Sequence, residues 1–275
     1  MWAKDGSKTL PLVLKRINEV IPEEVVNNRI FVDDNSVDNT REIAKSFGWQ
    51  VFFNEGRGIS NGANTALKHV TSDFFISFEQ DLVLAKEWWE KIPKHLLDAK
   101  VAVASGVRLP NQPIALRRLQ EYATERYRRT EKEAESFLYG KTLDNTIYKT
   151  DVIRRLGGFP KLSVSAGVDN VFAQRIHLSG YRWKVDYDVK STHLRTGLKD
   201  ELAHYYWYGT CASGLEQILF NKPVNLKSVI LRAFFSPIRG LDVAIQKNAP
   251  QVVYIYPLIR FNILRGVLHG KKRRY

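Results

Sequence analysis

The chain has 275 residues, 44% hydrophobic and 26% charged, a length that allows one sizeable domain or one domain with an appendage. Its single cysteine, Cys211, excludes an intrachain disulfide, and a reducing compartment is the simplest inference. The formal net charge is +13, and the N-terminus shows no charged-then-apolar leader, which argues against secretion.

Strand and helix patterns alternate along the first two thirds of the chain. Short runs rich in Val, Ile, Phe or Tyr predict strands at 29–33, 50–54, 73–79, 101–106, 145–149 and 181–186. Helical patterns predict helices at 10–20, 37–47, 59–70, 86–97, 114–135 and 168–178. Such alternation is typical of a largely parallel sheet covered by helices.

The two ends of the chain depart from this alternation. A doubly wound sheet normally opens with an apolar strand, and residues 1–3 are too short to supply one, so we expect that strand to be missing or replaced by another segment. After residue 193 the strands stop, and helices are expected at 201–220, 226–246 and 251–268. We therefore divide the chain into an α/β domain, 1–198, and a C-terminal helical segment, 199–275.

Two adjacent carboxylates, Asp33 and Asp34, end the strand at 29–33. In an open α/β sheet, ligands bind just beyond the carboxyl ends of the strands, where these side chains are expected. The alternative is that Asp34 or Ser36 only caps a helix beginning near Val37, since both residue types are good N-caps.

A second acidic strand end follows the apolar run at 74–78 and reads Glu79-Gln80-Asp81. Carboxylates two residues apart suit a hard divalent cation such as Mg²⁺ or Mn²⁺ bound together with a diphosphate. The alternative is a turn with solvated acids. Before this strand, small residues flank Arg57 at a helix start, where backbone amides and a cation would hold an anionic or carbonyl-rich ligand.

A third acid, Asp169, opens the amphipathic helix at 168–178. Its structural role would be to complement the positive N-terminal end of that helix. Its functional role would be that of a general base facing the cleft.

Taken in order, the segments 33–40, 54–64, 79–81, 157–159 and 167–169 resemble the family 2 inverting glycosyltransferases of GT-A fold, over roughly residues 4–193. The resemblance implies a mixed, mostly parallel α/β sheet with flanking helices, followed here by the C-terminal helical segment. It also implies a UDP or GDP sugar as donor and Mg²⁺ or Mn²⁺ as the metal ion. The QxxRW motif of processive synthases is absent, which argues for transfer of one sugar at a time. The implied acceptor is a glycan or a polyprenyl-linked molecule.

The resemblance assigns roles by position. It places Asp169 as catalytic base and Asp81 as metal ligand, with His193 helping to hold the metal or diphosphate, although a free surface histidine is the alternative. The residues it implies in binding the nucleotide sugar are Asp5, Asp33, Asp34, Arg57, Glu79 and Gln80. Three departures are a first strand that is missing or truncated before Lys4, Glu-Gln-Asp in place of the family's DxD, and Val168-Asp169 in place of its ED pair.

The basic charge is concentrated at the C-terminus. Residues 221–275 hold eleven Lys and Arg against one acid, Asp242, which leaves only +3 for residues 1–220. Helices with apolar faces and clustered cations suit the surface of an anionic membrane, although these helices could also simply pack on the catalytic domain. We expect a cytoplasmic enzyme, peripheral on the inner face of the cell membrane.

Two other functional classes remain open at this point. A catalytically inactive relative that acts as a binding or scaffold protein is favoured by the missing strand and the altered acidic motifs. Nucleic acid is not expected as a partner, because no zinc-finger spacing, helix-turn-helix signature or RNA-binding sheet motif accompanies the basic tail.

Overall fold

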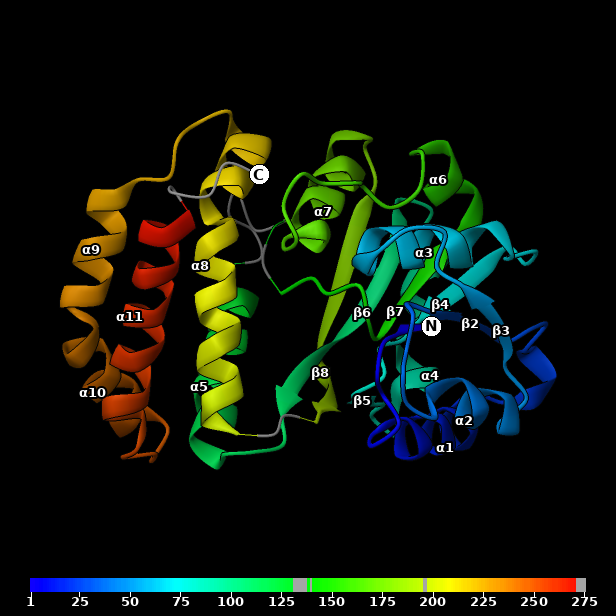
Figure 1. Cartoon of the computed structure of the whole chain (residues 1–275), viewed down its shortest axis with the longest axis horizontal. Helices are drawn as coiled ribbons and strands as arrows, with labels where there is room; N and C mark the ends of the chain where they lie inside the picture. Colours follow the sequence, from blue (N-terminus) through cyan, green and yellow to red (C-terminus); the bar gives the residue numbers. More distant parts are fainter. Residues whose placement is uncertain (131–137, 139, 195–196, 271–275) are drawn as a thin grey trace. The chain divides into compact units, whose positions relative to one another are not determined.

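The computed structural model describes residues 1–130, 138, 140–194 and 197–270. They form two compact units (Figure 1). The first unit contains 1–108, 130–162 and 168–194, and the second contains 109–129, 163–167 and 195–275. The expected helix over 114–135 is observed as α5, Ile114–Arg129, and 131–135 lies outside the described residues.

A three-stranded parallel sheet opens the first unit, in the order β1 (Trp2–Ala3), β2 (Ile30–Asp33), β3 (Gln50–Phe53). The first strand is therefore not missing, and of the two alternatives the truncated strand fits, because β1 has two residues. Trp2 pairs with Val32, and the backbone N–H of Val32 donates to the Met1 carbonyl at 2.9 Å, so two residues suffice to form β1. Helix α3 (Gly58–Lys68) packs against β1 and β2.

The other strands form a five-stranded sheet ordered β4 (Phe74–Ser77), β7 (Thr146–Lys149), β6 (Val101–Pro110), β8 (Arg182–His193), β5 (Leu82–Val83). The pairs β4–β7, β6–β7 and β5–β8 are antiparallel. The predicted class, a mixed sheet with flanking helices, is confirmed, and parallel pairing is found between β1, β2 and β3. Strand β8 is longer than predicted and extends to His193.

Proline explains where two predicted helices are divided. The expected helix over 86–97 appears as α4 (Trp88–Lys91) and a 3₁₀ turn, Pro93–Leu97. The expected helix over 226–246 appears as α9 (Leu226–Phe234) and α10 (Ser236–Gln246), with a proline in the first turn of α10. Proline lacks the N–H that would continue the preceding helix, and it is tolerated in a first turn.

The remaining helices of the first unit are short and flank the strands. They are α1 (Leu10–Val20), α2 (Thr40–Ser46), α6 (Thr150–Arg155) and α7 (Val168–Leu178). Helix α2 starts at Thr40 rather than near Val37, and its N-cap residue, Asn39, makes no side-chain capping bond. Neither Asp34 nor Ser36 therefore caps this helix.

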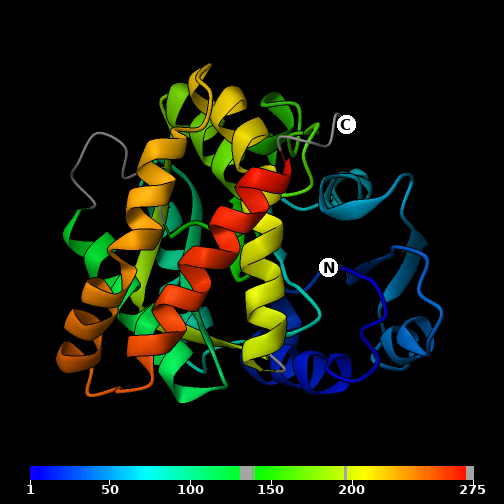
Figure 2. The ribbon, with the colours of Figure 1, turned by 60° about the vertical axis from the view of Figure 1, so that its left-hand side comes forward.

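The second unit is helical, and glycines bring two of its helices into close contact. Helices α8 (Leu198–Phe220) and α11 (Val252–Gly270) lie side by side (Figure 2). A Cβ at Gly266 would come within 2.2 Å of the Tyr206 carbonyl oxygen, and one at Gly209 within 2.3 Å of the Ile263 carbonyl oxygen. Only glycine at these two positions allows the backbones to approach this closely. Within the described residues, every helix is too short or too polar to cross a bilayer.

This crossing predicts a stability defect for Gly266→Ala. Alanine is the better helix former by about 1 kcal/mol. The added methyl group meets a backbone carbonyl that cannot move alone, and such overpacking costs about 1–3 kcal/mol. We expect a net loss of up to about 2 kcal/mol in the free energy of unfolding, measured by urea denaturation. Ala203→Ser, at an exposed position of α8, is the control and should change stability by less than about 0.5 kcal/mol.

Candidate functional site

The carboxyl ends of the parallel strands are joined through Asp5 and Asp33. The Asp5 carboxylate accepts a hydrogen bond from the Val37 N–H at 2.8 Å, and the Asp5 N–H donates to the Ser36 hydroxyl at 3.0 Å. Asp33 is fully buried and accepts from the Ser36 N–H at 3.2 Å. These carboxylates therefore hold the loops after β1 and β2 in place. The contact of either carboxylate with a ligand stays a prediction.

Asp34 connects the loop after β2 to the loop after β3. One carboxylate oxygen accepts from the Asn54 side-chain amide at 3.0 Å, and the other accepts from the Gly58 N–H at 2.9 Å. Arg57, which lies between Asn54 and Gly58 in the sequence, is exposed. The three loops therefore meet where an open α/β sheet binds its ligands, and the side chain of Arg57 is accessible there.

Gln80 connects this strand-end region to the acidic loop. Its side-chain oxygen accepts from the Lys4 N–H at 2.7 Å, and its side-chain NH₂ donates to the Lys4 carbonyl at 2.9 Å. Gln80 thus pairs with backbone as a neighbouring strand would. Through this pair the loop that follows β1 lies beside Glu79 and Asp81.

The register of two strands brings Asp81 to His193. Leu82 at the start of β5 pairs with His193 at the end of β8, and the Leu194 N–H donates to the Asp81 carbonyl at 2.7 Å. As a result, His193 Nε2 lies 3.1 Å from an Asp81 carboxylate oxygen. His193 is 5% exposed, which excludes the alternative of a free surface histidine.

Glu79, Asp81 and His193 form a group that fits a divalent cation. One ligand atom from each residue lies within 4.8 Å of the other two. Two carboxylates with one imidazole suit Mn²⁺, and the carboxylates with added water or phosphate oxygens also suit Mg²⁺. Glu79 is at the same time 3.6 Å from the guanidinium of Arg108, so this arginine lies at the edge of the group.

Arg108 and Asp144 are site residues that the sequence analysis missed. Arg108 is in β6, and its Nη1 lies 3.4 Å from the carboxylate of Asp144, which is fully buried. Neither residue belongs to a recognisable motif. The only available signal was one arginine in an otherwise apolar strand pattern, where an unpaired buried charge would be costly.

Asp169 lies near the same arginine. Burial raises the pKa of the Asp169 carboxyl above its ordinary value, while the positive charge of Arg108 opposes that rise. The backbone N–H of Asn170 also donates to Asp169 at 3.0 Å, and the Asn170 side chain donates to the Leu138 carbonyl. Asp169 is therefore a partly exposed carboxylate held in place at the start of α7, with a higher proton affinity than an ordinary aspartate.

The structure thus brings the predicted residues, together with Arg108 and Asp144, into two connected groups. Asp5, Asp33, Asp34 and Arg57 are at the ends of the parallel strands, and the second group combines the acidic loop with His193, Arg108, Asp144 and Asp169. Gln80 joins the two groups. The arrangement can bind an anionic ligand with a divalent ion and present a carboxylate base beside it.

Known proteins show the same fold. The family model described as glycosyl transferase family 2 matches residues 7–157. A mannosyltransferase from Pyrobaculum calidifontis, in complex with GDP-Man and Mn²⁺, superposes with a TM-score of 0.68 at 16% identity, over 98% of this chain and 85% of that one. TarS from S. aureus in complex with UDP gives 0.53 at 16% identity, over 100% and 90% of the two chains.

A third solved structure is glucosyl-3-phosphoglycerate synthase from Mycobacterium tuberculosis in complex with phosphoglyceric acid, with a TM-score of 0.58 at 14% identity over 82% of this chain and 79% of that one. At such identities the likeness shows the fold alone. No curated protein matches the sequence.

The geometry predicts that the acidic group binds Mn²⁺. Asp81→Asn removes one charged ligand, and we expect the dissociation constant for Mn²⁺, measured by calorimetry or electron spin resonance, to rise at least about tenfold. Glu90→Gln, which removes an exposed acid from α4, should leave it unchanged. Equal Mn²⁺ affinity in both variants would exclude Asp81 as a ligand.

Proposed function

Because the chain belongs to glycosyl transferase family 2, whose model covers more than half of it, we propose that it transfers a single sugar from a nucleotide-diphosphate sugar to an acceptor, with inversion at the anomeric carbon. The observation that carries this proposal is the grouping of Glu79, Asp81 and His193 beside Arg108, which in turn lies near Asp169. The acceptor is a hydroxyl group of a glycan or the phosphate of a polyprenyl lipid.

The proposed donor is a UDP or GDP sugar whose base and ribose bind at the ends of the parallel strands. Asp33 and Asp34 hold the loops that shape this region, and exposed Arg57 supplies a cation for the nucleotide. Solved structures of the same fold contain GDP-Man, UDP, UDP-GlcNAc and UDP-Glc, which supports a donor of this class.

We propose Glu79, Asp81 and His193 as the residues that hold Mg²⁺ or Mn²⁺. When bound, the ion neutralises the diphosphate and acts as a Lewis acid on its oxygens. Arg108, 3.6 Å from Glu79, adds a fixed positive charge at the place where the leaving diphosphate gains negative charge. The guanidinium of Arg108 is therefore already in position before the reaction begins.

Asp169 is the proposed general base. It takes the proton from the acceptor hydroxyl as that oxygen attacks the anomeric carbon, and the sugar–phosphate bond breaks on the opposite face. Burial raises the pKa and so the proton affinity of the carboxylate, while the positive charge of Arg108 opposes that rise. The Asn170 N–H, 3.0 Å away, fixes the orientation of the carboxylate.

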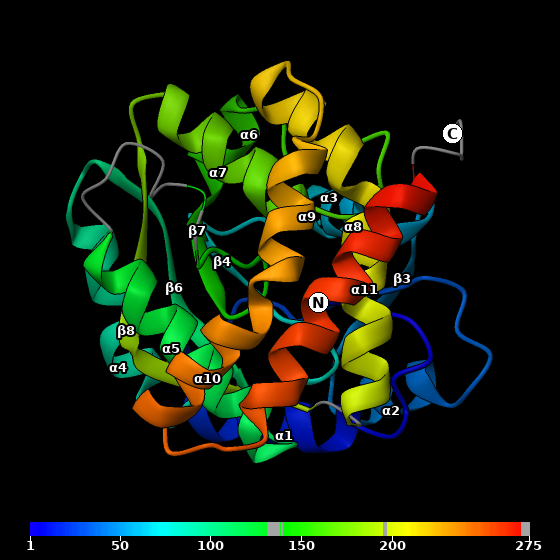
Figure 3. The same ribbon diagram turned by 90° about the vertical axis from the view of Figure 1, so that its left-hand side faces the viewer.

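The second unit supports a membrane location for the acceptor. Exposed apolar side chains recur at helical spacing along α9, the connecting residue Phe235 and α10. We call this set the apolar stripe: Leu231, Phe234, Phe235, Ile238, Leu241 and Ile245. Phe234 is 71% exposed and Ile245 is 73% exposed. Helices α9, α10 and α11 lie together (Figure 3), and exposed Lys227 and Arg232 on α9 add positive charge.

An apolar stripe with adjacent cations suits an anionic lipid surface, where the side chains enter the headgroup region and the cations contact phosphates. Burial of each such side chain contributes about 1.5–3 kcal/mol. We propose that the stripe holds the enzyme at the inner face of the cell membrane, where a lipid-linked acceptor would be found.

Asp169→Asn tests the catalytic assignment. The variant keeps the shape of the side chain but cannot take a proton, so we expect turnover to fall at least about 10²-fold, while donor affinity measured by calorimetry stays within about twofold. In the wild type, turnover should fall as the pH drops through a pKa above the ordinary range for aspartate. Asp151→Asn, at an exposed acid, is the control. Full activity of Asp169→Asn would contradict the role.

Co-sedimentation with vesicles tests the membrane proposal. At low salt the protein should bind vesicles rich in phosphatidylglycerol and bind pure phosphatidylcholine more weakly. The double variant Phe234→Ser/Ile238→Ser should bind at least about tenfold less tightly, because two large apolar side chains are lost. Leu178→Ser removes a side chain that is 77% exposed outside the stripe and should bind normally. Lack of wild-type binding to anionic vesicles would reject the proposal.

A further inference from the structure

One guanidinium nitrogen is shared between a buried acid and an acid of the candidate metal group. Arg108 Nη1 lies 3.4 Å from the carboxylate of Asp144 and 3.6 Å from the carboxylate of Glu79. Asp144 is fully buried, whereas Glu79 is half-buried. Since both acids attract the same nitrogen, the position of Asp144 controls how closely Arg108 pairs with Glu79.

The residue after Asp144 has an unusual backbone conformation. Asn145 is fully buried, and its φ of 61° lies in the left-handed region. Asparagine enters this region more readily than most residues, whereas an alanine is disfavoured there. In extended backbone the side chains of residues 144 and 145 would point to opposite faces of a sheet. The left-handed turn at Asn145 breaks that alternation directly before β7.

Hydrogen bonds to α4, β6 and β8 hold Asn145 in this conformation. Its carbonyl accepts from the Gly106 N–H at 3.3 Å and from the Trp88 indole N–H at 3.2 Å. Its side-chain NH₂ donates to the Val107 carbonyl at 3.4 Å, and its side-chain oxygen accepts from the Ser191 hydroxyl at 3.1 Å. Backbone and side chain of Asn145 are therefore both anchored.

Gly106 leaves the space that the Asn145 side chain occupies. A Cβ at position 106 would come within 2.9 Å of the Asn145 side-chain nitrogen and within 2.8 Å of the Val189 carbonyl oxygen. Arg108 follows two residues later, on the same face of β6, because side chains alternate along a strand. The strand that carries Arg108 is thus shaped to receive Asn145.

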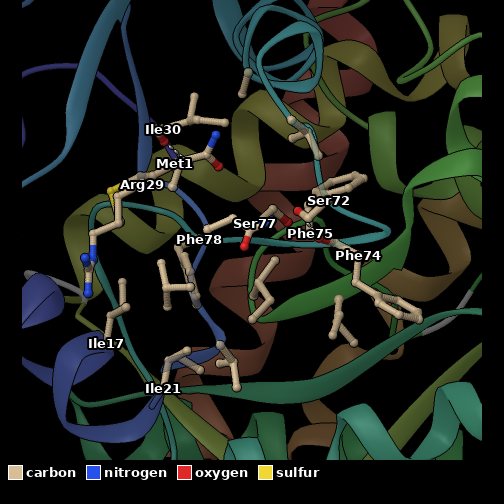
Figure 4. Close-up of a pocket in the computed structure, with 18 of the residues that line it drawn as sticks. Met1, Ile17, Ile21, Arg29, Ile30, Ser72, Phe74, Phe75, Ser77 and Phe78 are labelled. Carbon is tan, nitrogen blue, oxygen red and sulfur yellow. Dashed lines mark hydrogen bonds between the residues drawn. The ribbon is translucent and has the colours of Figure 1, made fainter. Parts of the chain in front are cut away.

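The residue before Asp144 is also fixed. The hydroxyl groups of Ser77 and Tyr148 both donate to the Leu143 carbonyl, the second at 2.8 Å. Ser77 is on β4, where it also lines an apolar cavity of the first unit (Figure 4). With Leu143 held in this way, the turn at Asn145 sets the direction in which the Asp144 side chain leaves the backbone.

We propose that Asn145 is a positioning residue that tunes the metal affinity of the site through Asp144. Its left-handed conformation holds the Asp144 carboxylate against Arg108. If residue 145 left this conformation, Asp144 would move away, and the guanidinium would pair more closely with Glu79 and neutralise part of its charge. Glu79 would then be a weaker metal ligand. This inference rests on the proposed metal-dependent function and deepens it.

Two substitutions that differ by one methyl group test the role of the conformation. Glycine adopts a positive φ without strain, whereas alanine does not. We expect Asn145→Ala to raise the dissociation constant for Mn²⁺, measured by calorimetry, at least about tenfold, and Asn145→Gly to raise it less than about threefold. A role in packing alone predicts the reverse order, because glycine leaves the larger cavity. An equal or larger effect of Asn145→Gly would overturn the proposal.

Asn248→Ala is the matched control. Asn248 also has a positive φ, of 47°, and it is exposed between α10 and α11. The substitution introduces the same backbone strain, and the dissociation constant for Mn²⁺ should stay unchanged. Thermal unfolding shows which variants are folded at the assay temperature. If Asn145→Ala is not folded, Asn145→Ser replaces it, because serine also disfavours a positive φ. Its constant must then exceed that of Asn145→Gly.

A double-mutant cycle tests whether Asn145 acts through Asp144. Asp144→Asn alone should raise the dissociation constant for Mn²⁺ about tenfold, because Arg108 is released toward Glu79. Adding the substitution at 145 should raise it by less than about twofold more, since the contact that Asn145 supports is already lost. Effects that multiply would show that the two residues act independently and would overturn the proposal.

A crystal structure of the folded alanine or serine variant separates this inference from the proposed function. If the wild type neither binds Mn²⁺ nor transfers a sugar, the proposed function fails, and the structure still tests the positioning role. We expect the distance between Arg108 Nη1 and the Asp144 carboxylate to grow beyond about 4 Å, the limit of an ion pair. An unchanged distance would overturn the positioning role, whatever the activity of the wild type.

Discussion

The charge balance around Arg108 is the constraint on which the candidate site depends. Its guanidinium lies within 3.6 Å of Glu79 and 3.4 Å of buried Asp144, and its charge acts on Asp169. Carboxylates gathered in one partly buried region raise one another's pKa, and a protonated acid can neither bind a metal nor accept a proton. The positive charge of Arg108 opposes this rise at Asp169. The metal group and the proposed base can share one region because Arg108 stands between them.

The location of the acidic loop followed from the sequence, because an apolar strand that ends in carboxylates has a known place in an α/β sheet. The proximity of His193 to Asp81 is harder to foresee, since it depends on the antiparallel register of β5 and β8. Arg108 and Asp144 could not be predicted in this way. They come from different parts of the chain and meet only when the strands are in register, and no local pattern encodes that meeting.

The fold was predictable to a similar degree. Alternating apolar runs predicted a largely parallel sheet, which holds for β1, β2 and β3, whereas β4–β7, β6–β7 and β5–β8 pair antiparallel, as the mixed sheet implied by the resemblance allows. The division of two helices could have been read from Pro93 and Pro237. Strand β1 was missed because a two-residue strand carries no periodicity, and its existence depends on hydrogen bonds to β2. With β1 present, one of the features that favoured an inactive relative is removed. The roles assigned to the individual acids stay predictions.

The pair formed by Gln80 and Lys4 has a consequence for how this chain tolerates sequence change. A Cβ at Gly6 would come within 2.9 Å of the Gln80 side chain, so positions 6 and 80 occupy adjoining space. A side chain at residue 6 would displace Gln80 from the Lys4 backbone, to which it makes bonds of 2.7 and 2.9 Å. The two positions are therefore epistatic, because a bulkier residue at 6 would need a smaller residue at 80. A smaller residue at 80 could not make the two hydrogen bonds to Lys4 that connect the two groups of the site.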